Sequence, residues 1–324
     1  MLALVFDGRP NLRDDYPQPR AKAGEALVAV RMAGICRTDL EIIKGYMSEG
    51  PRGGFRGVMG HEFVGTVVKG PRGWMDKRVV AEINCVCGQC DMCSSGLANH
   101  CRNRTVLGID GRDGVIAEFV CVPVRNMHEV PPGVDDVAAV FAEPLAAAFQ
   151  VVRQVRFDRN DKVVVIGDGR LGQLVARVLK LTVHRPVLVG KHEAKLEAAE
   201  KQGIETVLAD KFVAAGRADI VIDASGSASG LDLAMRTVRP RGTIVLKSTF
   251  AGAAGKLNLA PIVVNELNVV GSRCGPFPDA LKALASGDVD ISALVSRRYP
   301  LRDAMAALEA AADPANIKVL IDVQ

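Results

Sequence analysis

The chain has 324 residues, which is too many for one ordinary hydrophobic core and enough for two domains. Charged residues make up 24% and hydrophobic residues 48%, and this composition excludes a largely disordered chain. The 41 Lys and Arg residues are dispersed and leave a formal net charge of only +4, so the sequence lacks the basic patch typical of nucleic-acid binding.

The first part of the chain, to about residue 134, alternates short apolar runs with Gly and Pro. The runs predict strands of a β-rich domain near residues 26–30, 63–68 and 116–122. Residues 1–6 lack the basic flank of a signal peptide and predict a first strand. Because no run of about 18 apolar residues indicates a membrane span, we expect a cytoplasmic protein with neither membrane nor nucleic-acid partners.

An Ala-rich helix is predicted over residues 136–155, and beyond it the pattern changes. Residues 162–166 form a continuous apolar run, as expected for a parallel strand buried on both faces. Helices are then predicted over 171–181, 193–202 and 230–238, and strands at 187–189, 220–222, 243–246 and 318–321. Alternating strands and helices are typical of βαβ units and a doubly wound parallel sheet, an α/β fold.

A glycine-rich motif of the form G-x-G-x-x-G follows the strand at 162–166. It consists of Gly167, Asp168, Gly169, Arg170, Leu171 and Gly172. Between a strand and a helix, the first glycine permits a tight turn, the second lets a pyrophosphate approach the backbone, and the third lets helix and strand pack closely. The N–H groups at the helix start would then bind the phosphates. The motif therefore predicts a dinucleotide site; the alternative is an ordinary glycine turn.

The end of the second strand distinguishes NAD from NADP in such units, because NAD enzymes usually carry an acidic residue there for the ribose hydroxyls. Here the strand ends in Gly190, Lys191 and His192. A carboxylate that would repel a 2′-phosphate is missing and a cation follows, which favours NADP(H). The alternative is that Lys191 is only a solvated residue at the start of a helix.

Cysteines are concentrated in one segment, since five of the eight lie between residues 85 and 101. Four of them have the spacing C-x2-C-x2-C-x7-C, namely Cys87, Cys90, Cys93 and Cys101. Four thiolates can close a tetrahedron around zinc and leave no open position, so the site would be structural. The alternatives are a chance cluster, a disulfide pair or an iron–sulfur site. Cys85 is interpreted as a bystander, and Cys121 and Cys274 as packed thiols.

Three further motifs carry possible metal ligands. They are Gly34-Ile35-Cys36-Arg37-Thr38-Asp39, Gly60-His61-Glu62 and Ala142-Glu143-Pro144. In this order, before the glycine motif and on either side of the four cysteines, they closely resemble the zinc-dependent medium-chain alcohol dehydrogenase superfamily. The resemblance covers essentially the whole chain and is greatest with the polyol, sugar and threonine dehydrogenase branch.

The resemblance implies a particular fold and assembly. A β-rich, GroES-like catalytic domain at 1–144 would include a structural zinc lobe at 85–101. A Rossmann dinucleotide-binding domain would follow at 145–273, and a C-terminal segment, 274–324, would return to the catalytic domain. The resemblance also implies a homodimer or homotetramer.

The resemblance further implies a catalytic zinc site. Its ligands would be Cys36, His61 and Glu143. Glu62 is a fourth ligand in some relatives and lies behind the ligands in others. Thr38 matches the hydroxyl that takes the proton of the alcohol, and Asp39 matches a residue that orients the histidine. The implied reaction moves a hydride between a small alcohol and a nicotinamide cofactor.

One departure of this chain modifies that expectation, and one pairing of motifs adds a hypothesis. Many relatives have a histidine five residues after the zinc cysteine, where this chain has Glu41, so either Glu41 accepts the proton or water relays it. We hypothesise that Glu62 binds zinc in the resting enzyme and then gives way to water or substrate.

Scarce aromatic residues and a carboxylate-rich site favour a polyol or sugar as substrate. Two alternatives remain. One is a zinc-free, NADPH-dependent reductase of the same fold, and the other is a non-catalytic cofactor-binding protein that keeps only the structural zinc.

Overall fold

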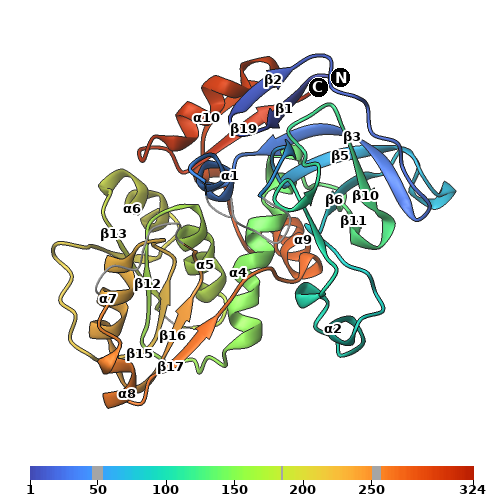
Figure 1. The fold of residues 1–324 in the computed structure, drawn as a ribbon. Helices are drawn as coiled ribbons and strands as arrows, with labels where there is room; N and C mark the ends of the chain where they lie inside the picture. Colours follow the sequence, from blue (N-terminus) through green and yellow to red (C-terminus); the bar gives the residue numbers. More distant parts are fainter. Residues whose placement is uncertain (46–53, 184, 250–256) are drawn as a thin grey trace. The chain divides into compact units, whose positions relative to one another are not determined.

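The computed structural model describes residues 1–45, 54–183, 185–249 and 257–324 (Figure 1). The chain forms two compact units, one of residues 1–143 together with 295–324 and the other of residues 144–294. The first unit is discontinuous because the last strands of the chain pair with strands from its beginning.

The segment 274–294 lies in the second unit, whereas the sequence analysis places it with the returning C-terminal segment. It contains helix α9 (Phe277–Ser286). Two contacts hold it to helix α4 (Ala142–Gln154). A Cβ atom on Gly275 would lie 1.9 Å from the carbonyl oxygen of Ala146, and Arg153 binds the carboxylate of Asp279 at 2.6 Å.

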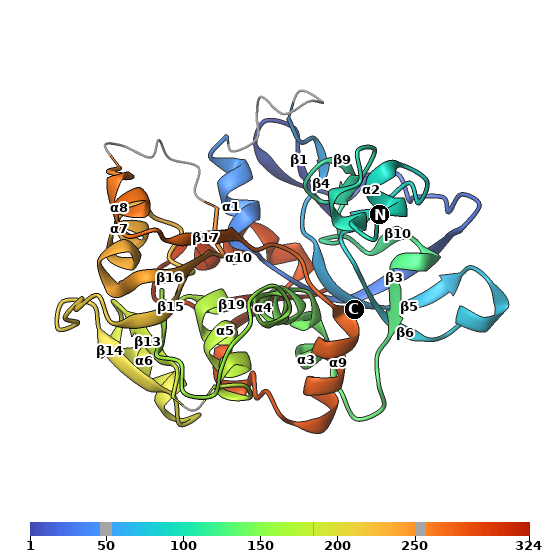
Figure 2. The same ribbon diagram turned by 90° about the horizontal axis from the view of Figure 1, so that it is seen from below.

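The first unit is built on a seven-stranded sheet with the order β11-β6-β5-β3-β19-β18, and β10 also pairs with β3. Its strands are β3 (Glu25–Gly34), β5 (Glu62–Lys69), β6 (Arg78–Ala81), β10 (Phe119–Pro123), β11 (Met127–Glu129), β18 (Val295–Pro300) and β19 (Lys318–Asp322). Figure 2 shows β3, β5 and β6 side by side. The C-terminal β19 therefore lies next to the long central strand β3.

Smaller elements complete the first unit. A three-stranded sheet contains β2 (Pro10–Arg13), β1 (Ala3–Phe6) and β4 (Gly57–Val58), and another contains β7 (Asn84–Cys85), β8 (Thr105–Leu107) and β9 (Gly111–Arg112). The helices are α1 (Arg37–Ile43), α2 (Asp91–Ser94), α3 (Asp136–Val140) and α10 (Ala304–Ala312). The predicted helix over 136–155 is thus two helices, α3 and α4. Pro144 has no N–H to donate to a preceding turn, so it suits the start of a new helix better than a helix interior.

The second unit is a six-stranded parallel sheet with the order β14-β13-β12-β15-β16-β17. Its strands are β12 (Val163–Ile166), β13 (Val187–Gly190), β14 (Glu205–Leu208), β15 (Ala218–Asp223), β16 (Val238–Leu246) and β17 (Asn268–Gly271). The other helices are α5 (Arg170–Lys180), α6 (Glu193–Glu200), α7 (Ala228–Thr237) and α8 (Ala260–Val264). From β12 the chain adds β13 and β14 on one side of the sheet and then β15, β16 and β17 on the other. Right-handed crossovers in these two directions place α5 and α7 on opposite faces of the sheet (Figure 1). The predicted doubly wound α/β fold is confirmed.

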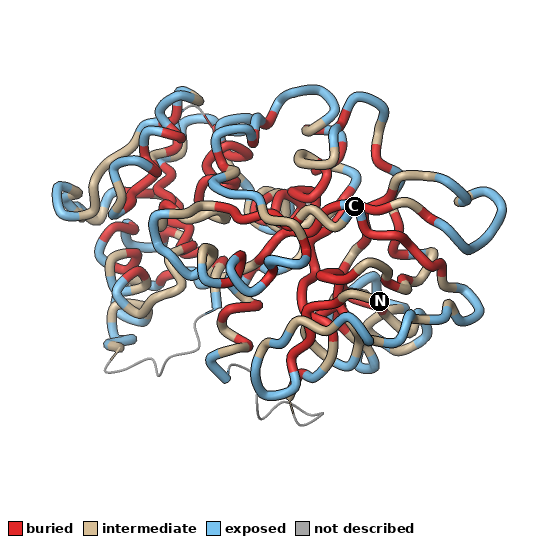
Figure 3. The backbone as a smooth tube through the Cα atoms, turned by 90° about the horizontal axis from the view of Figure 1, so that it is seen from above, coloured by how far each residue is buried: buried red, intermediate tan, exposed pale blue. Residues whose placement is uncertain are grey.

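Burial follows the sheets. The interior strands of both units are lined with fully buried Val, Ile, Leu and Ala residues, and exposed residues gather at the connecting turns (Figure 3). Strands β14 and β17, at the edges of the parallel sheet, are partly exposed and were not predicted because they lack a continuous apolar run. In the described parts of the chain, no helix has the length and apolar character needed to cross a membrane.

Candidate functional site

The side chain of Asp39 connects two of the expected metal ligands. Cys36 caps the N-terminus of α1, and its backbone N–H donates to Oδ2 of Asp39 at 2.7 Å. The other oxygen, Oδ1, lies 3.4 Å from Nδ1 of His61, in the loop before β5. One fully buried carboxylate thus accepts a hydrogen bond from the cysteine backbone and lies beside the histidine ring.

Three possible ligands converge beside this carboxylate. Ligand atoms of Cys36, His61 and Glu62 lie within 4.8 Å of one another. His61 and Glu62 are buried, and Cys36 is half-buried. A thiol, an imidazole and a carboxylate form a donor set that suits zinc. Among the described residues the group does not include Glu143, which is half-buried in the first turn of α4.

The pKa of His61 reflects its negatively charged neighbours. Burial is the largest single effect and would lower the pKa of the imidazole. The negative charges of Cys36 and Asp39, together with the hydrogen bonding of both groups to the ring, outweigh burial and hold the pKa well above its ordinary value. The site therefore attracts positive charge, which is the electrostatic property that a cation site needs.

A buried lysine completes the charge pattern and was missed by the sequence analysis. Lys318, the first residue of β19, is 1% exposed, and its ammonium group forms an ion pair with the carboxylate of Glu62. It also donates to the carbonyl oxygen of Ile35 at 3.2 Å and lies 5.9 Å from the ring centre of Phe141. Burial lowers the pKa of Lys318 to about 8, while the negative charges of Cys36 and Asp39 oppose that shift.

The pairing of three strands explains how this ion pair forms. Gly34 of β3 is opposite Glu62 of β5 on one side and Leu320 of β19 on the other. A Cβ atom on Gly34 would lie 2.5 Å from Nζ of Lys318 and 2.8 Å from Oε2 of Glu62. Glycine at this position therefore leaves the space in which the two charges meet. A lysine at the head of an apolar strand, Lys318-Val319-Leu320-Ile321, was the available sequence signal.

Thr38 and Glu41 lie on the same short helix, α1, as the cysteine that caps it. The thiol of Cys36 donates to Oγ1 of Thr38 at a sulfur–oxygen distance of 3.7 Å, so the hydroxyl lies beside the metal-ligand group. The carboxylate of Glu41 pairs with Nε of Arg37 at 2.8 Å and with Nζ of Lys44 at 3.7 Å. Glu41 is thus held in a surface ion-pair network at the other end of the helix.

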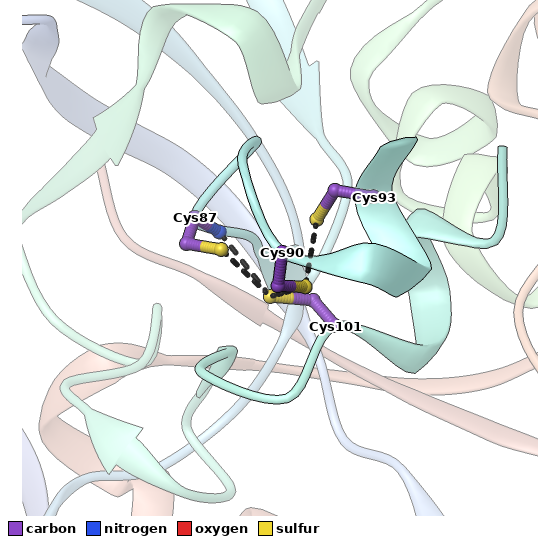
Figure 4. A group of neighbouring side chains, drawn as sticks. All are labelled: Cys87, Cys90, Cys93 and Cys101. Atoms are coloured by element: carbon purple, nitrogen blue, oxygen red, sulfur yellow. Dashed lines mark hydrogen bonds between the residues drawn. The ribbon is translucent and has the colours of Figure 1, made fainter. Parts of the chain in front are cut away.

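The four spaced cysteines also come together (Figure 4). Cys87 and Cys90 precede α2, Cys93 lies on it, and Cys101 follows it. Sulfur–sulfur distances are 3.6 Å for Cys90–Cys93, 3.8 Å for Cys90–Cys101 and 3.5 Å for Cys101–Cys87. None of the four is in a disulfide, because these distances are far longer than the ~2.05 Å of a disulfide bond.

The sulfur spacing matches a metal tetrahedron. Four thiolates at about 2.3 Å from a central zinc ion are about 3.8 Å apart, close to the observed values. The pKa shifts within the cluster are opposed: backbone N–H groups of Gln89 and Cys90 lower the pKa of Cys87 to about 6, whereas burial raises the pKa of Cys93 to about 11.

The remaining cysteines lie outside both metal-ligand groups. Cys85 is buried on β7, and burial raises the pKa of its thiol to about 11. Cys121, on β10, has a pKa raised to about 11 for the same reason. Cys274 is half-buried in the second unit. These are the properties of packed thiols.

The glycine motif forms the turn between β12 and α5. Gly167 has a φ of 115°, and a Cβ atom there would lie 2.8 Å from the backbone of Ala224. A Cβ atom on Gly172 would lie 1.8 Å from the carbonyl oxygen of Gly167. Around Gly169, which caps α5, a Cβ atom would meet no atom within 4 Å. Arg170 and Leu171 begin the helix. Two glycines therefore serve local packing, and the third faces open space.

Asp168, between those glycines, reaches across to the end of β13. Its Oδ2 accepts from the backbone N–H groups of Lys191 at 2.6 Å and His192 at 2.7 Å, and lies 3.0 Å from Nδ1 of His192. Asp168 is buried, whereas Lys191 is exposed. The structure thus brings the expected cofactor residues Gly190, Lys191 and His192 to the glycine motif through a carboxylate whose role the sequence analysis did not predict.

Two family models match the chain. An alcohol dehydrogenase GroES-like domain covers residues 22–132, and a zinc-binding dehydrogenase domain covers residues 171–286. A 2-dehydro-3-deoxy-L-galactonate 5-dehydrogenase of Pseudoalteromonas atlantica is 30% identical over 93% of this chain and 92% of its own length. A sorbitol dehydrogenase of Halalkalibacterium halodurans is 29% identical over 95% of this chain and 94% of its own.

Solved structures show the same fold. A putative zinc-binding dehydrogenase of Sinorhizobium meliloti, bound to NADP, is 28% identical with a TM-score of 0.89 and covers 99% of both chains. RspB of Escherichia coli, described as a short chain alcohol dehydrogenase and solved in complex with NADH, is 26% identical with a TM-score of 0.87, and the match covers 100% of this chain and 99% of its own. Similar folds thus occur with either nicotinamide cofactor.

Proposed function

The chain belongs to the zinc-dependent medium-chain alcohol dehydrogenase superfamily, and from that premise we propose that it oxidises a polyol or sugar-derived alcohol reversibly with a nicotinamide cofactor. The observation that carries the proposal is the convergence of Cys36, His61 and Glu62 in a chain that also has a G-x-G-x-x-G turn at the end of a parallel strand. A non-catalytic protein would have no need of the first group.

We propose that Cys36 and His61 hold a catalytic zinc ion, with Glu62 and Glu143 as the carboxylates available to it. Their donor set fits zinc, and the buried negative charges around His61 favour a bound cation. When bound, zinc supplies a Lewis acid that polarises the oxygen of the alcohol. The four-cysteine cluster fits a second, structural zinc.

The residues around the ligands have separate roles in this proposal. Thr38 takes the hydroxyl proton of the substrate, because its Oγ1 lies beside the thiol of Cys36. Asp39 keeps the His61 ring in a fixed orientation and receives the backbone N–H of Cys36. Because Arg37 and Lys44 hold Glu41, we propose that water rather than Glu41 carries the proton onward from Thr38.

Lys318 gives the Glu62 hypothesis a physical basis. Because Lys318 is paired with Glu62, the two side chains together add no net charge to the site. For the same reason, binding of Glu62 to zinc would require breaking a buried ion pair. We propose that Glu62 can leave and rejoin the metal because Lys318 holds it in place when it is not a ligand. An unchanged zinc content and pH–rate profile in Glu62→Gln would contradict this role.

The cofactor is proposed to lie on Gly167, Gly169 and the first turn of α5, with its pyrophosphate at the helix N-terminus. The sequence expectation of NADP(H) depended on the lack of a carboxylate near the end of β13. Asp168 places a carboxylate at the end of β13, so the reason for expecting NADP(H) rather than NAD(H) no longer holds.

A panel of polyols, sugar acids, simple alcohols and their carbonyl products, assayed with both cofactors beside a metal count, tests the function. We expect turnover of at least one polyol or sugar derivative with two zinc ions per chain. Turnover only on activated double bonds with one zinc would instead support the zinc-free reductase. One zinc with no turnover on any substrate would support a non-catalytic protein.

A further inference from the structure

The ribose end of the dinucleotide site has an unusual arrangement in this chain. NAD enzymes of this fold place an acidic side chain at the end of the second strand, about 20 residues beyond the glycine motif, where it accepts hydrogen bonds from the ribose. Here that strand, β13, ends at Gly190, which has no side chain to offer. The position of the missing carboxylate is therefore open to another residue.

Asp168 occupies that position. A Cβ atom on Gly190 would lie 2.5 Å from Cβ and 2.6 Å from Oδ2 of Asp168. The Asp168 side chain thus fills the volume into which a side chain at the end of β13 would project. Glycine at 190 and aspartate at 168 are consequently linked, because a larger residue at 190 would collide with the carboxylate.

The contacts of the two carboxylate oxygens differ. Oδ2 receives the N–H groups of Lys191 and His192, which are two backbone donors directed at one point beyond the strand. Such converging N–H groups would otherwise suit the 2′-phosphate of NADP(H). Oδ1 lies 3.2 Å from Nδ1 of His192. Since a carboxylate oxygen can accept two hydrogen bonds, Oδ1 can also accept one from a hydroxyl group.

Resting on the proposed function, we propose that Asp168 is the residue that recognises the adenosine ribose, and that it makes the chain prefer NAD(H) to NADP(H). A ribose 2′-OH can donate to the carboxylate. A 2′-phosphate would meet a fixed negative charge and find the two backbone donors already engaged. Lys191 is exposed, whereas Asp168 is buried and held by two backbone hydrogen bonds.

Direct binding measurements test this inference without relying on turnover. Dissociation constants for NADH and NADPH are measured by calorimetry or fluorescence on the full, zinc-loaded chain and on Asp168→Asn and Asp168→Ser. We expect the wild type to bind NADH at least tenfold more tightly than NADPH. In both variants that ratio should fall at least tenfold, mainly through tighter NADPH binding in Asp168→Asn.

Asp219 offers a matched control in the same unit. Its carboxylate also accepts a backbone N–H, from Lys162 at 2.8 Å, and pairs with a cation, Arg239, at 2.7 Å. It lies in β15 near the other end of the parallel strands, so Asp219→Asn should leave the cofactor ratio within about twofold. Thermal melting of each variant identifies any that are unfolded, and Asp168→Asn keeps the size of the side chain in case Asp168→Ser unfolds.

The outcomes separate this inference from the proposed function. A wild type that binds NADPH as tightly as NADH, or an unchanged ratio in the folded Asp168→Asn variant, would overturn the role of Asp168 and leave the dehydrogenase assignment intact. If neither cofactor binds, the proposed function fails and this inference fails with it.

Discussion

At the scale of single residues, the metal site depends on charges that the fold keeps out of water. Asp39, Glu62 and Lys318 are all fully or almost fully buried, and such groups are tolerated only when each is paired or hydrogen-bonded. The motifs at Cys36 and His61–Glu62 could be recognised in the sequence because the residues of each motif are adjacent along the chain. Lys318 could not, because its partner is more than 250 positions away and only strand pairing brings them together.

Replacement of Lys318 by methionine tests how strongly this pair stabilises the unit. The variant leaves the Glu62 carboxylate buried without its ammonium partner, so the free energy of unfolding should fall by about 3–5 kcal/mol. The double variant Lys318→Met with Glu62→Gln removes both charges and should recover much of that loss. Urea unfolding of the zinc-loaded protein measures both.

The matched control for this cycle is Lys44→Met. Lys44 pairs with Glu41 on the surface at 3.7 Å, and its side chain is 62% exposed, so its loss should change the free energy of unfolding by less than about 0.5 kcal/mol. Equal stability of Lys318→Met and the wild type would show that the buried pair contributes nothing.

The glycines of the cofactor turn predict two separable effects. Gly172→Ala places a methyl group 1.8 Å from the carbonyl oxygen of Gly167, and overpacking of this kind should lower the free energy of unfolding by about 1–3 kcal/mol. Gly169→Ala meets no neighbouring atom and has an ordinary φ of −70°, so stability should be unchanged.

Gly169→Ala should nevertheless bind NADH at least tenfold more weakly, since its methyl group would enter the space proposed for the pyrophosphate. Thermal melting and calorimetric titration of both variants distinguish the two effects. If Gly169→Ala binds NADH as tightly as the wild type, the cofactor does not bind at this turn.

At the scale of elements, the sequence predicted buried strands and long helices better than edges and breaks. Strands β3, β5, β12 and β15 have continuous apolar runs and were placed within a few residues. The break between α3 and α4 was missed because Pro144 lies in a run of helix-favouring residues. The four-cysteine segment was recognisable from spacing alone, since tight turns bring C-x2-C thiols together whatever surrounds them.

The cysteine segment predicts a simple change in zinc content. Cys93→Ala removes one of four converging thiols, and we expect one zinc per chain instead of two, with a lower melting temperature. Cys85→Ala is the control, because Cys85 lies in the same segment but outside the sulfur cluster. Metal analysis by mass spectrometry measures both variants. Loss of zinc from Cys85→Ala, or two zinc ions in Cys93→Ala, would contradict this assignment.

A second element-scale prediction concerns Arg112 on β9, which joins three other strands. Its guanidinium donates to Glu25 at 2.8 Å, to the Cys121 carbonyl at 3.3 Å and to Thr105 at 3.2 Å. Burial is the largest single effect and would raise the pKa of Glu25. The hydrogen bonds from Arg112 and from the backbone N–H of Lys22, together with the positive charges of both residues, outweigh burial, and the pKa lies below its ordinary value of 4.5.

Because the folded-state pKa of Glu25 is depressed, the stabilisation is complete above about pH 4.5 and is lost as the pH falls through the folded-state pKa. Arg112→Gln should therefore be less stable than wild type by about 1 kcal/mol at pH 7. Urea titrations at pH 7 and pH 3 should show the difference shrinking at the lower pH. A difference that is independent of pH would assign the effect to packing.

At the scale of the whole molecule, the order of elements along the chain predicted a doubly wound sheet and a β-rich unit, but not how the chain returns. Strands β18 and β19 belong to the first unit although 151 residues of the second unit, 144–294, precede them. No local sequence pattern predicts that the last strands rejoin the first unit, because this depends on which sheet contains the strand that pairs with β19. The resemblance to a known family supplied the expectation, with a boundary about 20 residues earlier than in the structure.

The edge of the parallel sheet bears on how copies of the chain associate. Among the described residues, strand β17 is the last of the parallel sheet, and together with α8 it exposes apolar side chains, with Val263 79%, Val264 77% and Val269 40% exposed. An unpaired strand edge with exposed apolar residues is suited to pairing with a second copy of itself about a two-fold axis. We therefore expect a homodimer, or a tetramer built from such dimers.

Charges at this edge should separate the subunits. The double variant Val264→Lys with Val269→Lys adds two positive charges per copy, which would face their own symmetry mates, so sedimentation at micromolar concentration should show monomers. Val213→Lys is the control, because Val213 is 80% exposed on a loop before β15 and should leave the dimer intact. A wild type that sediments as a monomer would exclude association at these concentrations. If the double variant remains dimeric, the interface does not involve the β17 edge.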